Sequence, residues 1–340
     1  MKKEKKRLSY SAVIALLCAA LLAAIIGSVV LGRYPIGFKE LCGIIGSKLF
    51  PIESFWTPTQ EALLLSHRLP RIALACLVGC ALSAAGASYQ GTFQNPMAAP
   101  DILGASAGAS FGAALAIVLG LGKAMITLFA FASGLLCVGL VIFVGGRAKG
   151  KRVIGLILAG IMIGSLFSSG TSFIKLVADP AQQLPAITYW LMGSLNGASG
   201  RDVLFALIPM LIGLVPLFVL RWRINILTLG DEEARTMGVN APRLRILVIL
   251  CATLVTAAAV SVSGVIGWVG LVIPHLARRL VGNNYRHLMP ASMLFGALFL
   301  LLVDDIARNA MTTEIPIGIL TSFIGAPFFI YLITRDGERI

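Results

Sequence analysis

The chain carries little charge. Only 13% of its 340 residues are Asp, Glu, Lys or Arg, whereas 58% are hydrophobic and the mean hydropathy is +0.91. Soluble domains carry about 25% charged residues, which cover their surface with polar groups. The scarcity of charge therefore excludes an ordinary soluble globular protein and favours a chain embedded in a membrane.

Groups that carry catalytic or metal chemistry are also scarce. The three histidines, His67, His275 and His287, show no metal-ligand spacing, and the six cysteines are scattered. No stretch resembles a catalytic triad or a pair of working carboxylates. We therefore expect no catalytic residue, no metal site and no cofactor bound by this chain.

The chain lacks a complete nucleotide-binding loop. The stretch GGRAKGKR at Gly145–Arg152 comes nearest to the phosphate-binding pattern G-x-x-x-x-G-K-[ST], but Arg152 stands where the magnesium-binding hydroxyl is required. Ion-coupled transporters usually place a carboxylate within a membrane span. Here the acidic residues of the apolar regions lie near span ends: Asp101, Asp179, Asp304, Asp305 and Glu314. Both absences indicate an energy source outside this chain.

Long apolar runs are abundant. Many are roughly 20 residues long, the length that crosses a bilayer as a helix, and backbone groups in lipid must pair within such helices. Ten candidate spans follow from the sequence: 9–31, 68–88, 101–121, 124–145, 153–177, 203–221, 244–263, 265–281, 288–307 and 315–334. The apolar residues 186–196 are too short to span, and we expect a half-helix there. The sequence predicts an all-α polytopic membrane protein, a single transmembrane domain over residues 1–340 with about ten helices per subunit.

Basic residues gather in alternate loops. With the N-terminus in the cytoplasm, the inside loops are 147–152, 221–243, 278–287 and 335–340, and all are basic. The outside segments 32–67, 178–202 and 305–314 contain fewer basic residues. This asymmetry is the usual mark of cytoplasmic loops, so the net charge of +13 does not indicate nucleic acid as a partner. We expect a multi-pass protein of the cytoplasmic (plasma) membrane with both termini inside.

Residues 225–240 form a polar, charged insert between two apolar runs. The stretch Asp231–Arg235 predicts a short helix, and Gly238 can adopt the left-handed conformation that ends a helix. A short helix across the cytoplasmic face would be a docking element. The alternative is a solvated loop with no special role.

Several stretches together resemble the FecCD family of ABC importer permeases. They are RLPR (Arg68–Arg71), GTFQNPMAAPDILG (Gly91–Gly104), LGDEEARTMGVN (Leu229–Asn240), GWVGLVIPHLAR (Gly267–Arg278) and EIPIGILTSFIGAPFFIYLI (Glu314–Ile333). The motifs follow the family order, and the resemblance runs from about residue 10 to about residue 335. The family contains permeases for iron-siderophores, haem and cobalamin.

The resemblance implies a type II ABC importer permease bundle. Its partners would be a second copy of the chain, two cytoplasmic ATPase subunits that use ATP and Mg, and an extracytoplasmic substrate-binding protein. The coupling loop at about 225–240 would contact the ATPases through Leu229, Gly230, Asp231, Glu232, Glu233, Ala234, Arg235 and Gly238.

The resemblance also implies residues at the outer face and along the path. Docking of the binding protein would use Arg68, Arg71 and Arg308, because arginine can hold a carboxylate through two hydrogen bonds. The alternative for Arg308 is a local ion pair with Asp304. The gate and translocation path would comprise Phe93, Asn95, Pro96, Ser168, Ser169, Ser172, Tyr189, Trp190 and Met192. The hydroxyls could instead bond within their own helix.

A ferric siderophore is the leading candidate for the cargo, with haem or cobalamin as variants. Lys149 and Lys151 stand where the cobalamin permease has small hydroxyls, which argues against cobalamin. An ion-coupled secondary transporter that works alone is an alternative from a different class.

The basic loops make the topology testable. In a cysteine-free background, single cysteines at Lys149, Arg235 and Gly337 should resist an impermeant thiol reagent in intact cells, whereas cysteines at Ser54 or Ser199 should react. Labelling of the cysteine at Arg235 from outside would contradict the predicted orientation.

Overall fold

The computed structural model describes residues 9–147, apart from 33, 35, 49 and 52, and residues 152–336. The described residues form helices and no strand. The basic N-terminal residues, the loop positions Lys149 and Lys151 with the centre of GGRAKGKR, and the position Gly337 lie outside this range.

Helices occupy all ten ranges predicted as spans. In chain order the elements are α1 (Tyr10–Val30), α2 (Phe38–Gly46), α3 (Pro58–Leu63), the π-helical turn η1 (Leu64–Arg68), α4 (Leu69–Thr92), α5 (Ala105–Val118), α6 (Lys123–Gly145), α7 (Arg152–Val177), α8 (Gln183–Leu191), α9 (Gly200–Leu227), α10 (Asp231–Thr236), α11 (Ala241–Ser263), α12 (Val269–Val281), α13 (Tyr285–Asn309) and α14 (Ile317–Asp336). The all-α class is therefore confirmed. A short helix, α8, covers the first part of the apolar segment 186–196, and the rest of that segment is irregular.

Seven helical segments of the described chain are long and apolar enough to cross a membrane: α1, the continuous α3–η1–α4 rod, α6, α7, α9, α11 and α13. Two of the remaining candidates, α5 and α12, have only 14 and 13 residues. A helix of this length rises about 20 Å, less than the roughly 30 Å hydrocarbon core of a bilayer. The predicted span 101–121 merges α5 with irregular backbone on both sides, and 265–281 merges α12 with the irregular backbone before it.

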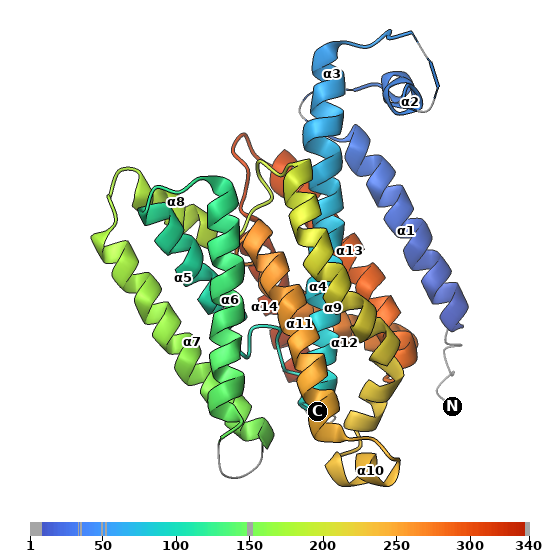
Figure 1. Ribbon diagram of the computed structural model, residues 1–340. Coiled ribbons are helices and arrows are strands. Elements are labelled where there is room, and N and C mark those ends of the chain that lie inside the picture. Colours follow the sequence, from blue (N-terminus) through green and yellow to red (C-terminus); the bar gives the residue numbers. More distant parts are fainter. Residues whose placement is uncertain are drawn as a thin grey trace.

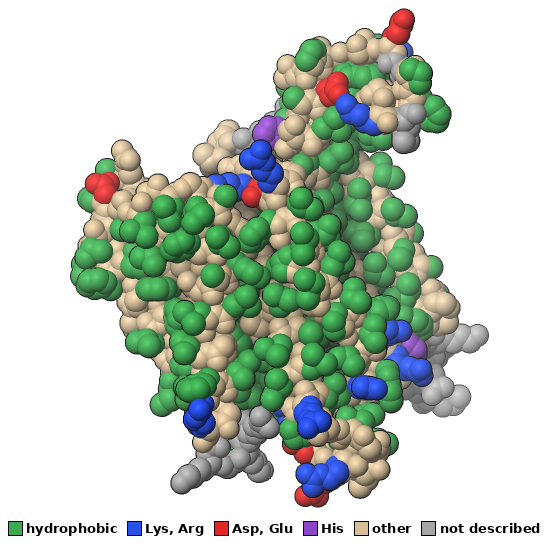
Figure 2. Space-filling model, viewed as in Figure 1, with side chains coloured by type: hydrophobic (Ala, Val, Ile, Leu, Met, Phe, Trp, Pro, Cys, Tyr) green, Lys and Arg blue, Asp and Glu red, His purple; other side chains and the backbone are tan. Residues whose placement is uncertain are grey.

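Helix α4 lies in the middle of the bundle (Figure 1). It packs against α9, α11, α12 and α13, whereas α5, α6, α7 and α8 form a group on one side and α1 packs against α13. The start of α1 and α10 lie at one end, which we call the inner end; α2, α3 and α8 lie at the other, the outer end. Figure 2 shows apolar side chains over the middle of the visible face, with most charged side chains near the two ends.

Glycines let the backbone of α4 touch its neighbours. A Cβ atom built on Gly86 would lie 1.8 Å from the carbonyl oxygen of Gly270 in α12, and one on Gly79 would lie 2.2 Å from that of Gly296 in α13. Neither contact could accommodate even a methyl group without moving a helix. Small residues at such crossings are typical of helix packing in membranes.

These contacts predict a large difference between two otherwise similar substitutions. Gly86→Ala should lower the free energy of unfolding by about 1–3 kcal/mol, because it overpacks a backbone contact. Gly139→Ala in α6 is the matched control, since nothing lies within 4 Å of the added Cβ. Thermal unfolding of the detergent-solubilised protein measures both, and equal midpoints would contradict the close packing of α4 on α12.

Candidate functional site

The predicted short helix is present at the inner end as α10, Asp231–Thr236. Its C-terminal boundary is set by Gly238, which has φ +76°. The N–H of Gly238 donates to the carbonyl of Arg235 at 3.0 Å, and the N–H of Val239 donates to that of Ala234 at 2.9 Å. This pair of bonds is the Schellman arrangement, in which a left-handed glycine satisfies the last carbonyls of a helix.

Helix α10 has a buried face and an exposed face. Ala234 is fully buried beneath it, whereas Glu232, Glu233 and Arg235 are exposed. Two large apolar side chains on either side of the helix, Leu229 and Met237, are also exposed. The charged and apolar groups together form a surface directed away from the bundle, and Gly230 provides the turn that leads into it with φ +126°.

The broken segment between α4 and α5 contains the predicted gate residues. Phe93 is buried and stacks on Tyr89 with ring centroids 5.6 Å apart. The side chain of Asn95 accepts a hydrogen bond from the backbone N–H of Met97 at 2.8 Å, which shapes the turn before the next helix. Asn95 and Pro96 line a cavity of about 690 Å³ at the inner end, together with basic side chains of α12.

The three serines predicted to line the path all lie on α7. Ser168, Ser169 and Ser172 are exposed on the surface of the single subunit, so they do not meet the gate residues within one copy. The hydroxyl of Ser172 donates to the carbonyl of Ser168 at 3.0 Å, which is the intrahelical bond that the sequence left open as an alternative.

Helix α8 separates two cavities. Tyr189 and Trp190 line one of about 360 Å³, whose wall also contains Ser194. Met192 lines the other, of about 640 Å³, whose wall is mostly apolar and includes Phe323 of α14. Tyr189, Trp190 and Met192, which the sequence predicted to line the path, thus each border a cavity.

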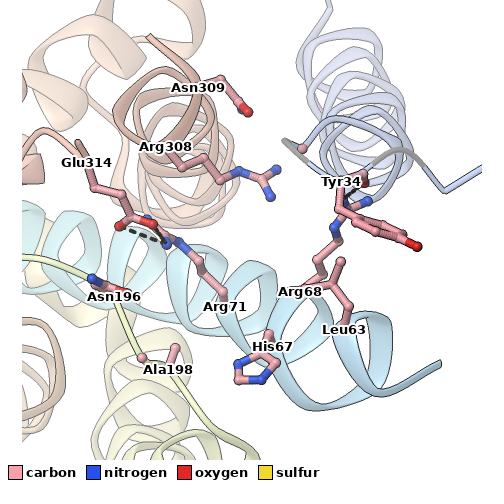
Figure 3. A pocket seen from close by; sticks show the side chains of 12 residues that line it. Tyr34, Leu63, His67, Arg68, Arg71, Asn196, Ala198, Arg308, Asn309 and Glu314 are labelled. Atoms are coloured by element: carbon pink, nitrogen blue, oxygen red, sulfur yellow. Dashed lines mark hydrogen bonds and ion pairs between the residues drawn. The ribbon is translucent and has the colours of Figure 1, made fainter. Parts of the chain in front are cut away.

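A fourth cavity, of about 280 Å³, lies at the outer end (Figure 3). All three arginines predicted to dock a partner line it: Arg68, Arg71 and Arg308. His67 and Glu314 contribute to the same wall. The structure thus brings together side chains that lie far apart in the sequence.

Arg71 is held by two carboxylates. It donates to both oxygens of Asp304 at 2.9–3.1 Å and to those of Glu314 at 2.9–3.0 Å. The side chain of Asp304 is 0% exposed, that of Arg71 12% and that of Glu314 23%. Burial in these surroundings is tolerable only because each charge meets an opposite charge in good geometry.

Arg68 and Arg308 tie α1 to the bundle. Arg68 is buried at the end of the π-turn η1. It donates to the carbonyl of Val29 (2.8 Å), in the last turn of α1, and to that of Tyr34, beyond the end of the helix. Carbonyls at these positions have no partner within the helix. Arg308 donates to Ser28 and to Asp305.

The ion pair that the sequence suggested for Arg308 has a different partner in the structure. The acid is Asp305, three residues earlier, because Asp304 faces α4 and binds Arg71. The Arg71–Asp304 pair joins residues 233 positions apart, and no local pattern of charge could have revealed it.

A helical membrane bundle with cavities at both ends, an irregular segment after its central helix and a short charged helix at its inner end suits a transport permease. The FecCD transport family matches residues 20–335, and the chain belongs to this family. It is thus an ABC importer permease.

Two relatives and one solved structure show the extent of the similarity. The chain is 37% identical over 332 residues to the molybdate import system permease protein MolB of Haemophilus influenzae, covering 97% of this chain and 98% of that protein. It is 43% identical over 273 residues to a Helicobacter pylori protein named for iron chelatin transport, covering 80% and 82%. A structure described as a metal-chelate type ABC transporter in an inward-facing conformation superposes with a TM-score of 0.84 at 36% identity, covering 96% of this chain and 100% of that one.

The outer ion pair gives a stability prediction. Arg71→Met should lower the free energy of unfolding by roughly 3–5 kcal/mol, because it leaves the buried Asp304 carboxylate without its partner. The double variant with Asp304→Leu should recover most of this loss. Lys48→Met is the control, since its partner Glu61 lies at the surface and no change in unfolding temperature is expected. A double variant less stable than Arg71→Met would contradict the pairing.

Proposed function

We propose that this chain is the permease subunit of an ATP-driven importer that takes up an iron complex, most simply a ferric siderophore, from an extracytoplasmic binding protein. The observation that carries the coupling to ATP is α10, a capped helix at the inner end with exposed acidic and apolar side chains. Such a surface suits insertion into a cleft of a partner protein.

The proposed assembly contains two copies of this chain and two ATPase subunits, which use ATP and Mg. The second copy would cover α7, where Ser168, Ser169 and Ser172 lie exposed among large apolar side chains. The path would then run between the copies and past α8. The N- and C-termini would lie in the cytoplasm, on the side of α10.

An ion-coupled transporter receives less support from the charged groups. Among the described residues, the acids of α13 lie in its last two turns, and both are paired with arginines. Glu314 is likewise bound to Arg71. A carrier driven by protons or sodium usually has an ionisable residue within a span along its path.

Docking of the binding protein is proposed at the outer cavity. The cationic side chains of Arg68, Arg71 and Arg308 converge there, although each is already bonded within the subunit. Glu314 has the most exposed of the three carboxylates that these arginines hold. A carboxylate of the incoming protein would therefore compete with Glu314 for Arg71, rather than with the deeply buried Asp304.

The side chains that line the cavities indicate which kind of cargo the permease can accommodate. The cavity beside Met192 and Phe323 is large and mostly apolar, which suits a bulky organic chelate better than a small hydrated anion. Molybdate is the second candidate, since the permease that is similar over 97% of the chain is named for it. Haem and cobalamin share the bulk of a siderophore.

The coupling role predicts an uncoupled permease from single changes in α10 and its cap. Glu233→Lys reverses an exposed charge, and Gly238→Val puts a β-branched residue at φ +76°, at a cost of roughly 1–2 kcal/mol. Both variants should reach the membrane but lose ATPase co-purification or cargo-stimulated hydrolysis. Gly120→Val is the matched control, because Gly120 has φ +69° and open space around it but lies at the outer end.

Uptake into proteoliposomes tests the energy source and the cargo. The complete importer, with its binding protein, is offered radiolabelled iron in a hydroxamate siderophore, and unlabelled haem, cobalamin and molybdate are added as competitors. A parallel assay offers radiolabelled molybdate. We expect iron uptake that requires a catalytically intact ATPase and is insensitive to a protonophore. Uptake by the permease alone, abolished by a protonophore, would contradict the proposal; uptake of molybdate only would establish the second candidate.

A further inference from the structure

Arg245 joins three elements at the inner end. It lies in the second turn of α11 and is only 3% exposed, although its neighbours in sequence belong to a basic region. Its two terminal nitrogens donate to the carboxylate of Asp231 at 3.1 and 2.6 Å, and its Nε donates to the carbonyl of Thr92 at 3.3 Å. Asp231 begins α10 and Thr92 ends α4.

The bond to Thr92 meets a specific need of α4. The last carbonyls of a helix have no partner within it, and a buried one must find a donor elsewhere. The Nε of Arg245 supplies that donor, while the two terminal nitrogens of the same guanidinium bind Asp231. The hydrogen bonds from Arg245 hold the pKa of the Asp231 carboxyl below its usual value.

A second bond ties the same end of α4 to the segment before α10. Gln94 has φ +52°, a backbone conformation that residues other than glycine rarely adopt. Its side-chain amide donates to the carbonyl of Leu227, the last residue of α9, at 2.7 Å. A strained residue of this kind persists only where its surroundings fix it. Asn95 and Pro96 follow directly, so the link is made at the gate segment.

We propose that Arg245 is a positioning residue that transmits movement of α10 to the end of α4 and hence to the gate at Asn95–Pro96, with Gln94 as the second point of attachment. The inference rests on the proposed function of α10 as the helix that contacts an ATPase. Because α10 has only six residues, a displacement imposed on it acts at once on Asp231 and therefore on Arg245. The guanidinium passes this displacement to α4, since the same group binds both elements.

The first experiment measures the link in the permease alone. Spin labels are placed at Arg235 in α10 and at Met97 beside the gate, both exposed, in a cysteine-free background, and their distance distribution is recorded by double electron–electron resonance. Arg245→Gln should broaden the distribution, and Arg243→Gln, an exposed neighbour on α11, should leave it unchanged. An unchanged distribution in Arg245→Gln would overturn the proposed link whether or not an ATPase binds.

The second experiment measures coupling in the complete importer. Arg245→Gln should reduce cargo transported per ATP hydrolysed by at least about fivefold, the lower end of the range for coupled sites. Asp231→Asn should do the same, and the double variant should be no worse than either, because both act through one link. Arg245→Lys keeps the charge but cannot bind both partners, so it should restore the ratio only in part.

The two experiments separate the possible failures. If Arg245→Gln lowers transport and hydrolysis in equal proportion, its role is structural only and the proposal is wrong. If the unmodified permease binds no ATPase, the proposed function of α10 fails, and the distance measurement still decides whether Arg245 ties α10 to α4.

Discussion

The contact of the α4 backbone with α12 and α13 is the constraint on which the rest of the structure depends. Gly86 against Gly270 and Gly79 against Gly296 leave no room for side chains, so α4 cannot shift sideways without separating the helices. The helix therefore behaves as a rod whose two ends carry the functional groups. Arg71 lies near its outer end and binds Asp304 of α13; the carbonyl of Thr92 at its inner end binds Arg245 of α11.

The arginine links at the two ends of α4 differ in which charge is buried. At the outer end the carboxylate of Asp304 is 0% exposed, and removing its partner would strand a negative charge in a medium of low dielectric constant. At the inner end the carboxylate of Asp231 is 53% exposed and can be hydrated, but the guanidinium of Arg245 is 3% exposed and would be left buried without its counter-charge. Both links therefore resist separation, the outer one through a buried acid and the inner one through a buried base.

The parts of the fold that follow from composition and local pattern could be predicted from the sequence. Hydropathy located a helix in each of the ten ranges, and the charged insert with Gly238 gave α10 and its cap, because both depend on neighbouring residues alone. Hydropathy could not separate α5 and α12 from the irregular residues beside them, since Ile102, Leu103 and residues 265–268 are apolar too. The partner of Arg71 could not be predicted for a different reason. A pairing across 233 residues is set by how α4 and α13 pack, not by local spacing.

The hydroxyls near the proposed path show how a permease can be polar without holding its cargo. Ser172 donates to the carbonyl of Ser168, Thr171 to that of Phe167, and Thr188 in α8 to that of Leu184. Each hydroxyl hydrogen is thereby used within its own helix, and only oxygen lone pairs remain for a passing ligand. A path lined in this way tolerates polar groups on the cargo but offers few donors that would bind it. Under the proposed function, tight recognition is left to the binding protein, and the permease needs only to open and close around a weakly held ligand.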